Sequence, residues 1–128
     1  MKPECKIDSF GTKYWCVNGK LHREDGPAIE YADGTKFWYI NNKLHREDGP
    51  AIEYSNGTKY WCVNGKLHRE DGPAVEHFRG FKEWWINGKE ISEEEFIRIK
   101  RYCRTCNSLL SFTKAINQYI IYCPKCQR

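Results

Sequence analysis

Three consecutive segments of this chain repeat one another at a period of 23 residues, without insertion or deletion. Residues 11–33 read GTKYWCVNGKLHREDGPAIEYAD, residues 34–56 read GTKFWYINNKLHREDGPAIEYSN, and residues 57–79 read GTKYWCVNGKLHREDGPAVEHFR. A fourth copy begins at residue 80 as GFKEWWINGKE and then diverges. Such a period indicates one small supersecondary unit per repeat, which buries its apolar side chains by stacking on its neighbours.

Within each repeat, short strand-forming runs alternate with turn-forming residues. Residues 13–17 and 28–31 are rich in aromatic and β-branched residues with a period of two. Between them, Asn18-Gly19 favours a type I′ hairpin turn, and Asp33-Gly34 gives the same signal at the junction with the next repeat. Asp25-Gly26-Pro27 forces a turn or an extended conformation. We therefore expect about two strands and a short third in each repeat.

These signals predict a mainly β protein whose repeats form an elongated antiparallel sheet of β-hairpins. Composition changes after the fourth, partial repeat, so the chain divides into an edge segment, a repeat array, a capping helix and a terminal module. The boundaries are residues 1–10, 11–91, 92–101 and 102–128.

The repeat resembles the MORN family, whose units carry Asp-Gly, an aromatic residue, Asn-Gly and His in this order. Asp33-Gly34, Phe37, Asn41 and His45 follow that order, although the aromatic residue and Asn41 are closer together than is usual. The variant W-x-x-N-G-x-x-H-R-x-D-G-P-A, seen at residues 15–28, is more similar to repeats in proteins of large DNA viruses and bacteriophages. The resemblance implies a scaffold that contacts proteins or lipids, and a phage or viral inhibitor of a host defence or regulatory protein.

A His-Arg-Glu-Asp block recurs in all three full repeats. One copy could be a metal or acid–base site, but an enzyme needs one asymmetric centre, so threefold repetition predicts no catalytic residues. The favoured interpretation is structural, with His and Arg packed on aromatic rings and the carboxylates pairing with Arg. The alternative is a row of cationic groups that binds a phosphate-bearing or acidic partner. The candidate binding residues are His22, Arg23, His45, Arg46, His68 and Arg69.

Tryptophan recurs at the same position in all four copies, and we expect an internal stack of these rings, with an exposed aromatic platform as the alternative. The position after it accepts Cys, Tyr or Trp, so it is interpreted as a packing position. The tryptophans are Trp15, Trp38, Trp61 and Trp84, and the cysteines that follow two of them are Cys16 and Cys62.

The sequence after the array predicts a short helix and a zinc ribbon. Ser92 with Glu95 forms a capping box, and Phe96 lies on the same helical face as Ile99. Two C-x2-C pairs follow, separated by 16 residues, with strands expected at residues 109–113 and 116–122. Four thiolates complete a tetrahedral site, so we expect one structural Zn²⁺ per chain. The predicted ligands are Cys103, Cys106, Cys123 and Cys126.

The net charge of +4 has its basic excess in the tail, because residues 101–128 contain five basic residues and no Asp or Glu. Arg101, Arg104 and Lys125 are therefore further candidate contacts for nucleic acid or protein. No apolar run reaches the length of a membrane span, and residues 1–10 lack the apolar core of a signal peptide. These features predict a cytoplasmic protein, in the host cytosol if it is viral.

Together these patterns favour a non-enzymatic binding protein with a protein partner. Two alternatives stay open, namely nucleic-acid binding through the basic ribbon and sequestration of small nucleotides by the repeat loops. The sheet edge at residues 1–10 is also compatible with a homodimer.

Overall fold

The computed structural model describes residues 2–99, 111–115 and 118–122. The chain divides into two compact units, Met1–Glu90 and Ile91–Arg128. The protein is mainly β, with many short antiparallel strands and one short helix, as the sequence predicts.

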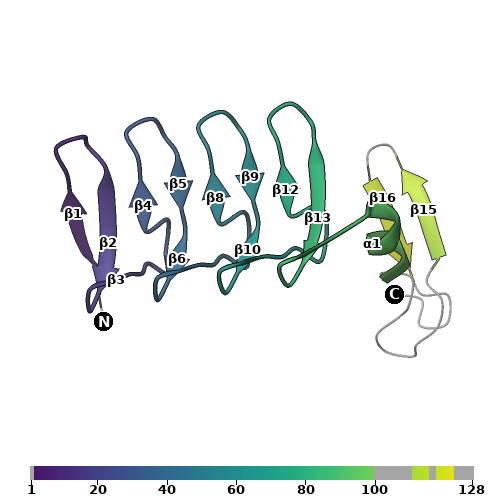
Figure 1. Cartoon of the computed structure of the whole chain (residues 1–128), viewed down its shortest axis with the longest axis horizontal. Coiled ribbons are helices and arrows are strands. Elements are labelled where there is room, and N and C mark those ends of the chain that lie inside the picture. The colour runs from purple at the N-terminus through teal and green to yellow at the C-terminus, as the bar shows by residue number, and fades with distance from the viewer. Residues whose placement is uncertain (1, 100–110, 116–117, 123–128) are drawn as a thin grey trace. The chain divides into compact units, whose positions relative to one another are not determined.

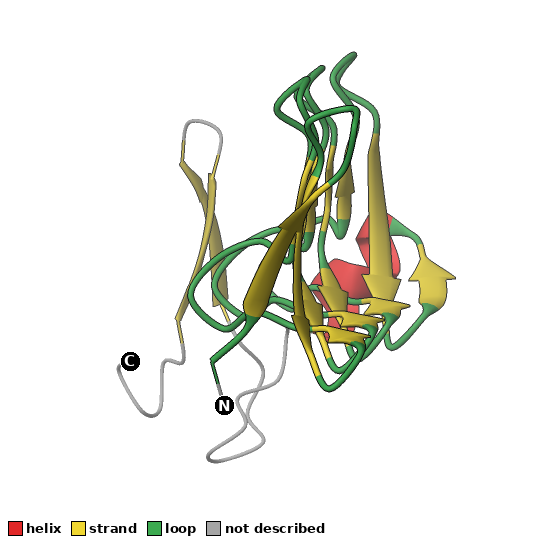
Figure 2. Cartoon of the chain, turned by 90° about the vertical axis from the view of Figure 1, so that its left-hand side faces the viewer, coloured by secondary structure: helices red, strands yellow, loops and turns green. Residues whose placement is uncertain are grey.

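The repeats form a ten-stranded sheet whose hairpins lie side by side in a row (Figure 1). Viewed along that row, successive hairpins nearly superimpose, as expected for near-identical repeats (Figure 2). In spatial order the strands are β1 (Glu4–Ile7), β2 (Lys13–Val17), β4 (Ile29–Glu30), β5 (Lys36–Phe37), β8 (Ile52–Glu53), β9 (Lys59–Tyr60), β12 (Val75–Glu76), β13 (Lys82–Ile86) and β14 (Lys89–Ile91), with β3 (Lys20–Leu21) paired to β2.

The first strand of the middle repeats is interrupted at its tryptophan. Strand β5 ends before Trp38, and the chain resumes as a separate hairpin of β6 (Tyr39–Ile40) and β7 (Lys43–Leu44). The same break at Trp61 separates β9 from β10 (Cys62–Val63), which pairs with β11 (Lys66–Leu67). Each middle repeat therefore contributes its first and last strands to the large sheet and its two central strands to a small hairpin.

The Asn-Gly turns have the predicted type I′ geometry. Asn18 and Gly19 have φ angles of 50° and 74°, and the equivalent pairs of the other copies are also positive. Their positions are Asn41-Asn42, Asn64-Gly65 and Asn87-Gly88.

The type I′ prediction is wrong at the repeat junctions. Gly34 has a φ of 93°, whereas Asp33 is not among the residues with positive φ. Tyr31 N–H donates to the Thr35 carbonyl at 2.9 Å, which closes a three-residue loop of the kind that ends in a left-handed glycine. The Asp33 carboxylate accepts the Thr35 N–H at 2.9 Å, so this side chain stabilises the alternative turn.

The N-terminal segment continues the repeat pattern. Strand β1 pairs with β2 in register from Glu4 opposite Cys16 to Ile7 opposite Lys13. This is the place that β4, β8 and β12 take in later repeats, so β1 is the last strand of a preceding half-repeat.

Cross-strand register gives the sheet two chemically distinct faces. On the charged face, lysine and glutamate alternate across the strands as Lys13, Glu30, Lys36, Glu53, Lys59, Glu76 and Lys82. On the opposite, aromatic face, the partners are Tyr14, Ile29, Phe37, Ile52, Tyr60, Val75 and Glu83. Opposite charges directly across an antiparallel pair stabilise it, so the charged face balances its own charge.

A row of alanines explains why the tryptophans do not stack on one another. Ala28 is fully buried, and its backbone bonds join it to Trp15 on one side and to Phe37, the neighbour of Trp38, on the other. Neighbouring indoles are therefore two strands apart, about 9.5 Å, beyond the 4.5–7 Å of ring pairs. Among the described residues no two tryptophan rings are paired, so the predicted internal stack is wrong.

The second unit contains the predicted helix and a hairpin. Helix α1 spans Glu93–Ile99, and Ser92 caps it by accepting the Glu95 N–H at 3.0 Å. Strands β15 (Ser111–Ala115) and β16 (Gln118–Tyr122) pair antiparallel, with both starting points later than predicted. No helix within the described ranges has the length and apolar character required to cross a membrane.

Candidate functional site

Each arginine of the His-Arg-Glu-Asp blocks lies over the ring of a tryptophan of its own repeat. The guanidinium carbons of Arg23, Arg46 and Arg69 lie 4.0, 4.0 and 3.8 Å from the ring centroids of Trp15, Trp38 and Trp61. At this distance a cation interacts favourably with the ring face. In each full repeat, the arginine of the block therefore contacts the tryptophan ring of the same repeat.

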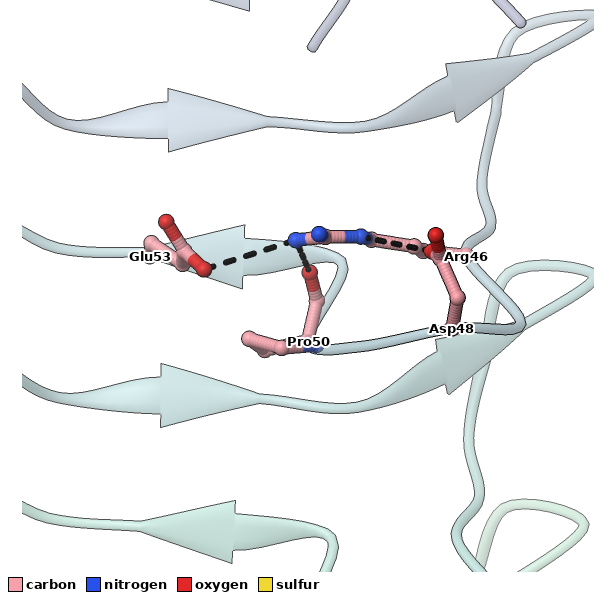
Figure 3. A network of polar contacts seen from close by, with 4 residues as sticks. All are labelled: Arg46, Asp48, Pro50 and Glu53. Carbon is pink, nitrogen blue, oxygen red and sulfur yellow. Dashed lines mark hydrogen bonds and ion pairs between the residues drawn. The ribbon is translucent and has the colours of Figure 1, made fainter. Parts of the chain in front are cut away.

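The same guanidinium is bound by three acceptors of its own repeat (Figure 3). Arg46 Nε donates to Asp48 at 3.0 Å, and its Nη1 donates to the Pro50 carbonyl at 3.1 Å and to Glu53 at 3.4 Å. Arg23 and Arg69 make the same set of contacts, with ion-pair distances of 3.7 and 3.1 Å to the glutamate.

Glycine covers the other side of each guanidinium. A Cβ built on Gly49 would lie 2.9 Å from Arg46 Cζ, and Gly26 and Gly72 would meet Arg23 and Arg69 equally closely. The arginine is therefore enclosed between an indole ring and a backbone segment. A side chain at the glycine position would have to displace the guanidinium.

The histidines join one repeat to the next. His45 Nδ1 accepts the backbone N–H of Asn64 at 3.1 Å, and His22 accepts that of Asn41 at the same distance. His68 does the same for Asn87 at 3.0 Å. Backbone bonds such as Arg46 N–H to the Cys62 carbonyl at 3.1 Å run beside these contacts. The histidines therefore contribute to the stacking of repeats.

The arginine contacts match the structural interpretation of the blocks, whereas the histidines bind backbone N–H groups of the next repeat in place of the expected aromatic ring. The arginine and histidine side chains retain only 16–22% of their exposure. In contrast, the carboxylates of Glu47 and Asp48 are 83% and 86% exposed. The solvent-facing chemistry of the loops is therefore acidic.

An open groove of about 800 Å³ separates the loops of the first two repeats. Trp38 and Ile40 line it together with residues of both blocks, including Glu24, Asp25 and Asp48. Acidic side chains on its rim do not suit a phosphate ligand. No group of three or more potential metal ligands converges in the part of the chain that the structure describes.

The aromatic face carries a continuous line of rings that the sequence interpretation did not single out as a site. Tyr31 packs edge-on against Phe37 with centroids 5.5 Å apart, Phe37 against Tyr54 at 6.0 Å, and Tyr54 against Tyr60 at 5.6 Å. We call these four residues the tyrosine ladder. The tyrosines at positions 31 and 54, one period apart, were the signal available in the sequence.

The tyrosine ladder is partly open to solvent and uncharged. Tyr31 and Tyr54 are 39% and 38% exposed. Burial, more than the neighbouring Tyr60 and Tyr31, raises the pKa of Tyr54 above its ordinary value, so its hydroxyl stays protonated at neutral pH. This hydroxyl remains both a donor and an acceptor.

Carboxylates stand at both ends of the aromatic face. At the N-terminal end the Tyr14 hydroxyl donates to Asp8 at 3.1 Å. At the other end Glu83 takes the place of a ladder ring opposite Val75 and accepts the Trp85 indole N–H at 2.9 Å. At the same end of the array, the exposed Phe78 and Phe81 pack against His77.

The remaining predicted site residues lie outside the described residues. They are the four cysteines Cys103, Cys106, Cys123 and Cys126, together with Arg101, Arg104 and Lys125. The other cysteines occupy the array: Cys62 is buried, Cys16 half-buried and Cys5 exposed.

Comparisons with known proteins return no relative. No protein-family model matches the chain, and neither the curated proteins nor the solved structures give a match.

Proposed function

We propose that this chain is a non-catalytic scaffold that binds a protein partner through the tyrosine ladder. The observation that carries the proposal is the uninterrupted edge-to-face packing from Tyr31 to Tyr60 on a partly exposed sheet face. Tyrosine is enriched at protein interfaces because it adds large contact area and a hydroxyl at a small entropic cost.

The charge distribution favours a protein over a nucleic acid as the partner of this face. Asp8 and Glu83 stand at its two ends, and four lysines of the array lie on the other face opposite glutamates, namely Lys13, Lys36, Lys59 and Lys82. A platform for bases needs a basic groove beside the rings to hold the phosphates. Nucleic-acid binding through Arg101, Arg104 and Lys125 stays a prediction.

Sequestration of small nucleotides by the loops receives no support from the geometry. A phosphate approaching Arg46 would have to displace Asp48, Glu53 and the Pro50 carbonyl, and it would face exposed carboxylates on the way. The partner we favour is a host protein, which follows from the resemblance of the repeats to those of phage and viral proteins.

Zinc binding by the tail remains part of the proposal. The hairpin of β15 and β16 lies between the two C-x2-C pairs in the sequence, and Ser111 is paired with Tyr122. This pairing supports the proposal because Ser111, which follows the first C-x2-C pair in the sequence, lies beside Tyr122, which precedes the second. A donor set of four cysteine thiolates suits a structural zinc, which would supply folding energy to this module.

The test compares substitutions on the two faces of the same sheet. Tyr31→Ala/Tyr54→Ala removes the exposed part of the ladder, and Lys36→Ala/Lys59→Ala is a matched pair of exposed changes on the charged face. Wild-type and variant proteins are used to capture partners from host lysate, and the captured protein is then purified and titrated by calorimetry. We expect a loss of affinity of at least about 30-fold for the tyrosine variant alone.

Two outcomes contradict the proposal. Equal affinity of the tyrosine variant and wild type would exclude the ladder as the binding surface. Loss of affinity for the lysine variant only would move the binding surface to the charged face. Circular dichroism of both variants checks that the array is folded before either result is interpreted.

A further inference from the structure

Strand β1 leaves one edge of the ten-stranded sheet open. It is the first strand in the spatial order, and β2 is its only partner among the described residues. All four of its residues are exposed, with Ile7 at 64%. An open edge of this kind is a template for pairing with another strand.

Hydrogen bonds to β2 determine which groups of β1 face outward. Asp8 N–H donates to the Thr12 carbonyl at 3.0 Å, so Asp8 directs its backbone groups toward β2. Because these directions alternate along a strand, Lys6 and Glu4 also face β2, whereas Cys5 and Ile7 present their N–H and C=O groups to the open edge.

We propose that β1 pairs antiparallel with β1 of a second copy of this chain, with Cys5 opposite Cys5 of the second copy. Residues whose backbone groups face the open edge must lie opposite such residues of the second copy. The registers that compete with the proposed one are therefore those shifted from it by two residues. The charges of Glu4 and Lys6 discriminate among them.

Compared with the two neighbouring registers, only the proposed register brings opposite charges together. It places Glu4 opposite Lys6 of the second copy and Lys6 opposite Glu4 of the second copy. A shift in one direction puts Glu4 opposite Glu4, and a shift in the other puts Lys6 opposite Lys6. Like charges directly opposite destabilise a strand pair, and opposite charges stabilise it.

Backbone and apolar contacts are compatible with the same register. The two Cys5 residues exchange their N–H and C=O groups, and each Ile7 N–H meets the Pro3 carbonyl of the second copy. The exposed Ile7 side chain then packs beside Pro3, which ends the ladder because proline has no N–H to donate. So short an interface predicts a weak, reversible dimer.

Dimerisation in this way would double the surface available on the aromatic face. A two-fold axis through the strand pair, perpendicular to the sheet, keeps equivalent faces on the same side. Two tyrosine ladders would then lie on one continuous sheet. The dimer does not depend on the function proposed for the ladder, since β1 contributes no ladder residue.

The experiment is sedimentation equilibrium of the full chain with zinc and reductant, up to about 1 mM protein. In a homodimer, Lys6→Glu alone or Glu4→Lys alone places two pairs of like charges directly opposite one another. We therefore expect at least about tenfold weaker self-association of each variant. An equimolar mixture of the two variants restores opposite charges in a heterodimer, and the double variant E4K/K6E restores them in a homodimer. Cys5→Ser should associate as wild type does.

The mixture distinguishes a charge effect from a general disruption of the strand by either substitution. Recovery of association in the mixture shows that the charges at these two positions control pairing, and recovery in the double variant supports the register. Monomeric wild type at the highest concentration overturns the proposal, and so does undiminished association of the two single variants. Loss of association without recovery in either combination also overturns it, because the register requires charge complementarity.

Discussion

The guanidinium carbon of Arg46 lies 4.0 Å from the centre of the Trp38 ring, and the same group donates to Asp48 at 3.0 Å. Arg46→Lys keeps the charge but removes the planar group that stacks and donates along two edges. We expect the free energy of unfolding to fall by about 2 kcal/mol, measured by urea denaturation. Glu47→Ala, in the same loop but 83% exposed, should change it by less than about 0.5 kcal/mol, and an equal loss would contradict this account.

Gly49→Ala tests the enclosure of that guanidinium from the opposite side. Its Cβ would lie 2.9 Å from Arg46 Cζ, so the arginine must move away from Trp38 or Asp48. Alanine would otherwise stabilise by up to about 1 kcal/mol through the unfolded state, whereas crowding costs about 1–3 kcal/mol, so we expect net destabilisation. In the Arg46→Lys background the loss should shrink. Additive losses would show that Gly49 acts independently of the arginine.

Ala51→Val tests the alternation of small and large residues that separates the tryptophans. Ala51 is fully buried, and its backbone bonds join it to Trp38 on one side and to Tyr60, the neighbour of Trp61, on the other. Added methyl groups have no space there, so we expect a loss of about 1–3 kcal/mol in the free energy of unfolding. Ala32→Val is the matched control at an exposed junction position, and we expect it to be nearly neutral in the same denaturant titration. Equal losses of unfolding free energy at both positions would contradict tight packing around Ala51.

Much of the array follows from the sequence because its signals are local. The Asn-Gly pairs require positive φ at both turn residues, and the 23-residue period places them at equal intervals. The junction turn escaped prediction because Asp33 can either take a positive φ or bond the Thr35 N–H. The sequence does not show which interaction is stronger.

The candidate sites depend on contacts that composition does not reveal. The recurrence of Trp38 predicts burial, but strand register decides that Ala51, not a second indole, lies beside it. Likewise, Arg46 is recognisable as repeated, whereas its three acceptors become evident only when the loop folds back on β8. The tyrosine ladder needs the same register, since Phe37 and Tyr54 are 17 residues apart in the sequence.

Cys62 is expected to resist alkylation in the folded protein. It is buried, and burial raises the pKa of its thiol to about 11 from 9.0, which alone lowers the thiolate fraction at neutral pH about 100-fold. Exposed Cys5 in the same chain is the internal comparison. Peptide mapping by mass spectrometry after timed iodoacetamide treatment at low micromolar protein should show Cys5 modified first. In urea the two rates should converge, and fast modification of native Cys62 would contradict its burial.

Asp33→Asn is expected to flatten the acid dependence of stability. Acceptance of the Thr35 backbone N–H, more than the contacts with the Thr35 and Ser55 hydroxyls, lowers the pKa of Asp33 below its ordinary 3.8. A carboxyl whose pKa is lower in the folded state stabilises the protein above its unfolded pKa, and loses this effect as pH falls through the folded value. We therefore expect the free energy of unfolding of wild type to fall more steeply than that of the variant below about pH 4.

The junction between the second and third repeats provides the reciprocal change for this experiment. Asn56 occupies the equivalent position, and its side-chain oxygen accepts the Thr58 N–H at 2.9 Å, the same distance as in the Asp33 turn. The neutral amide thus retains the turn, so Asp33→Asn should remain folded, whereas Asn56→Asp should add an acid-dependent step. Urea denaturation between about pH 3 and pH 7 measures both variants against wild type. Parallel curves for all three proteins would show that the junction carboxylate does not couple protonation to folding.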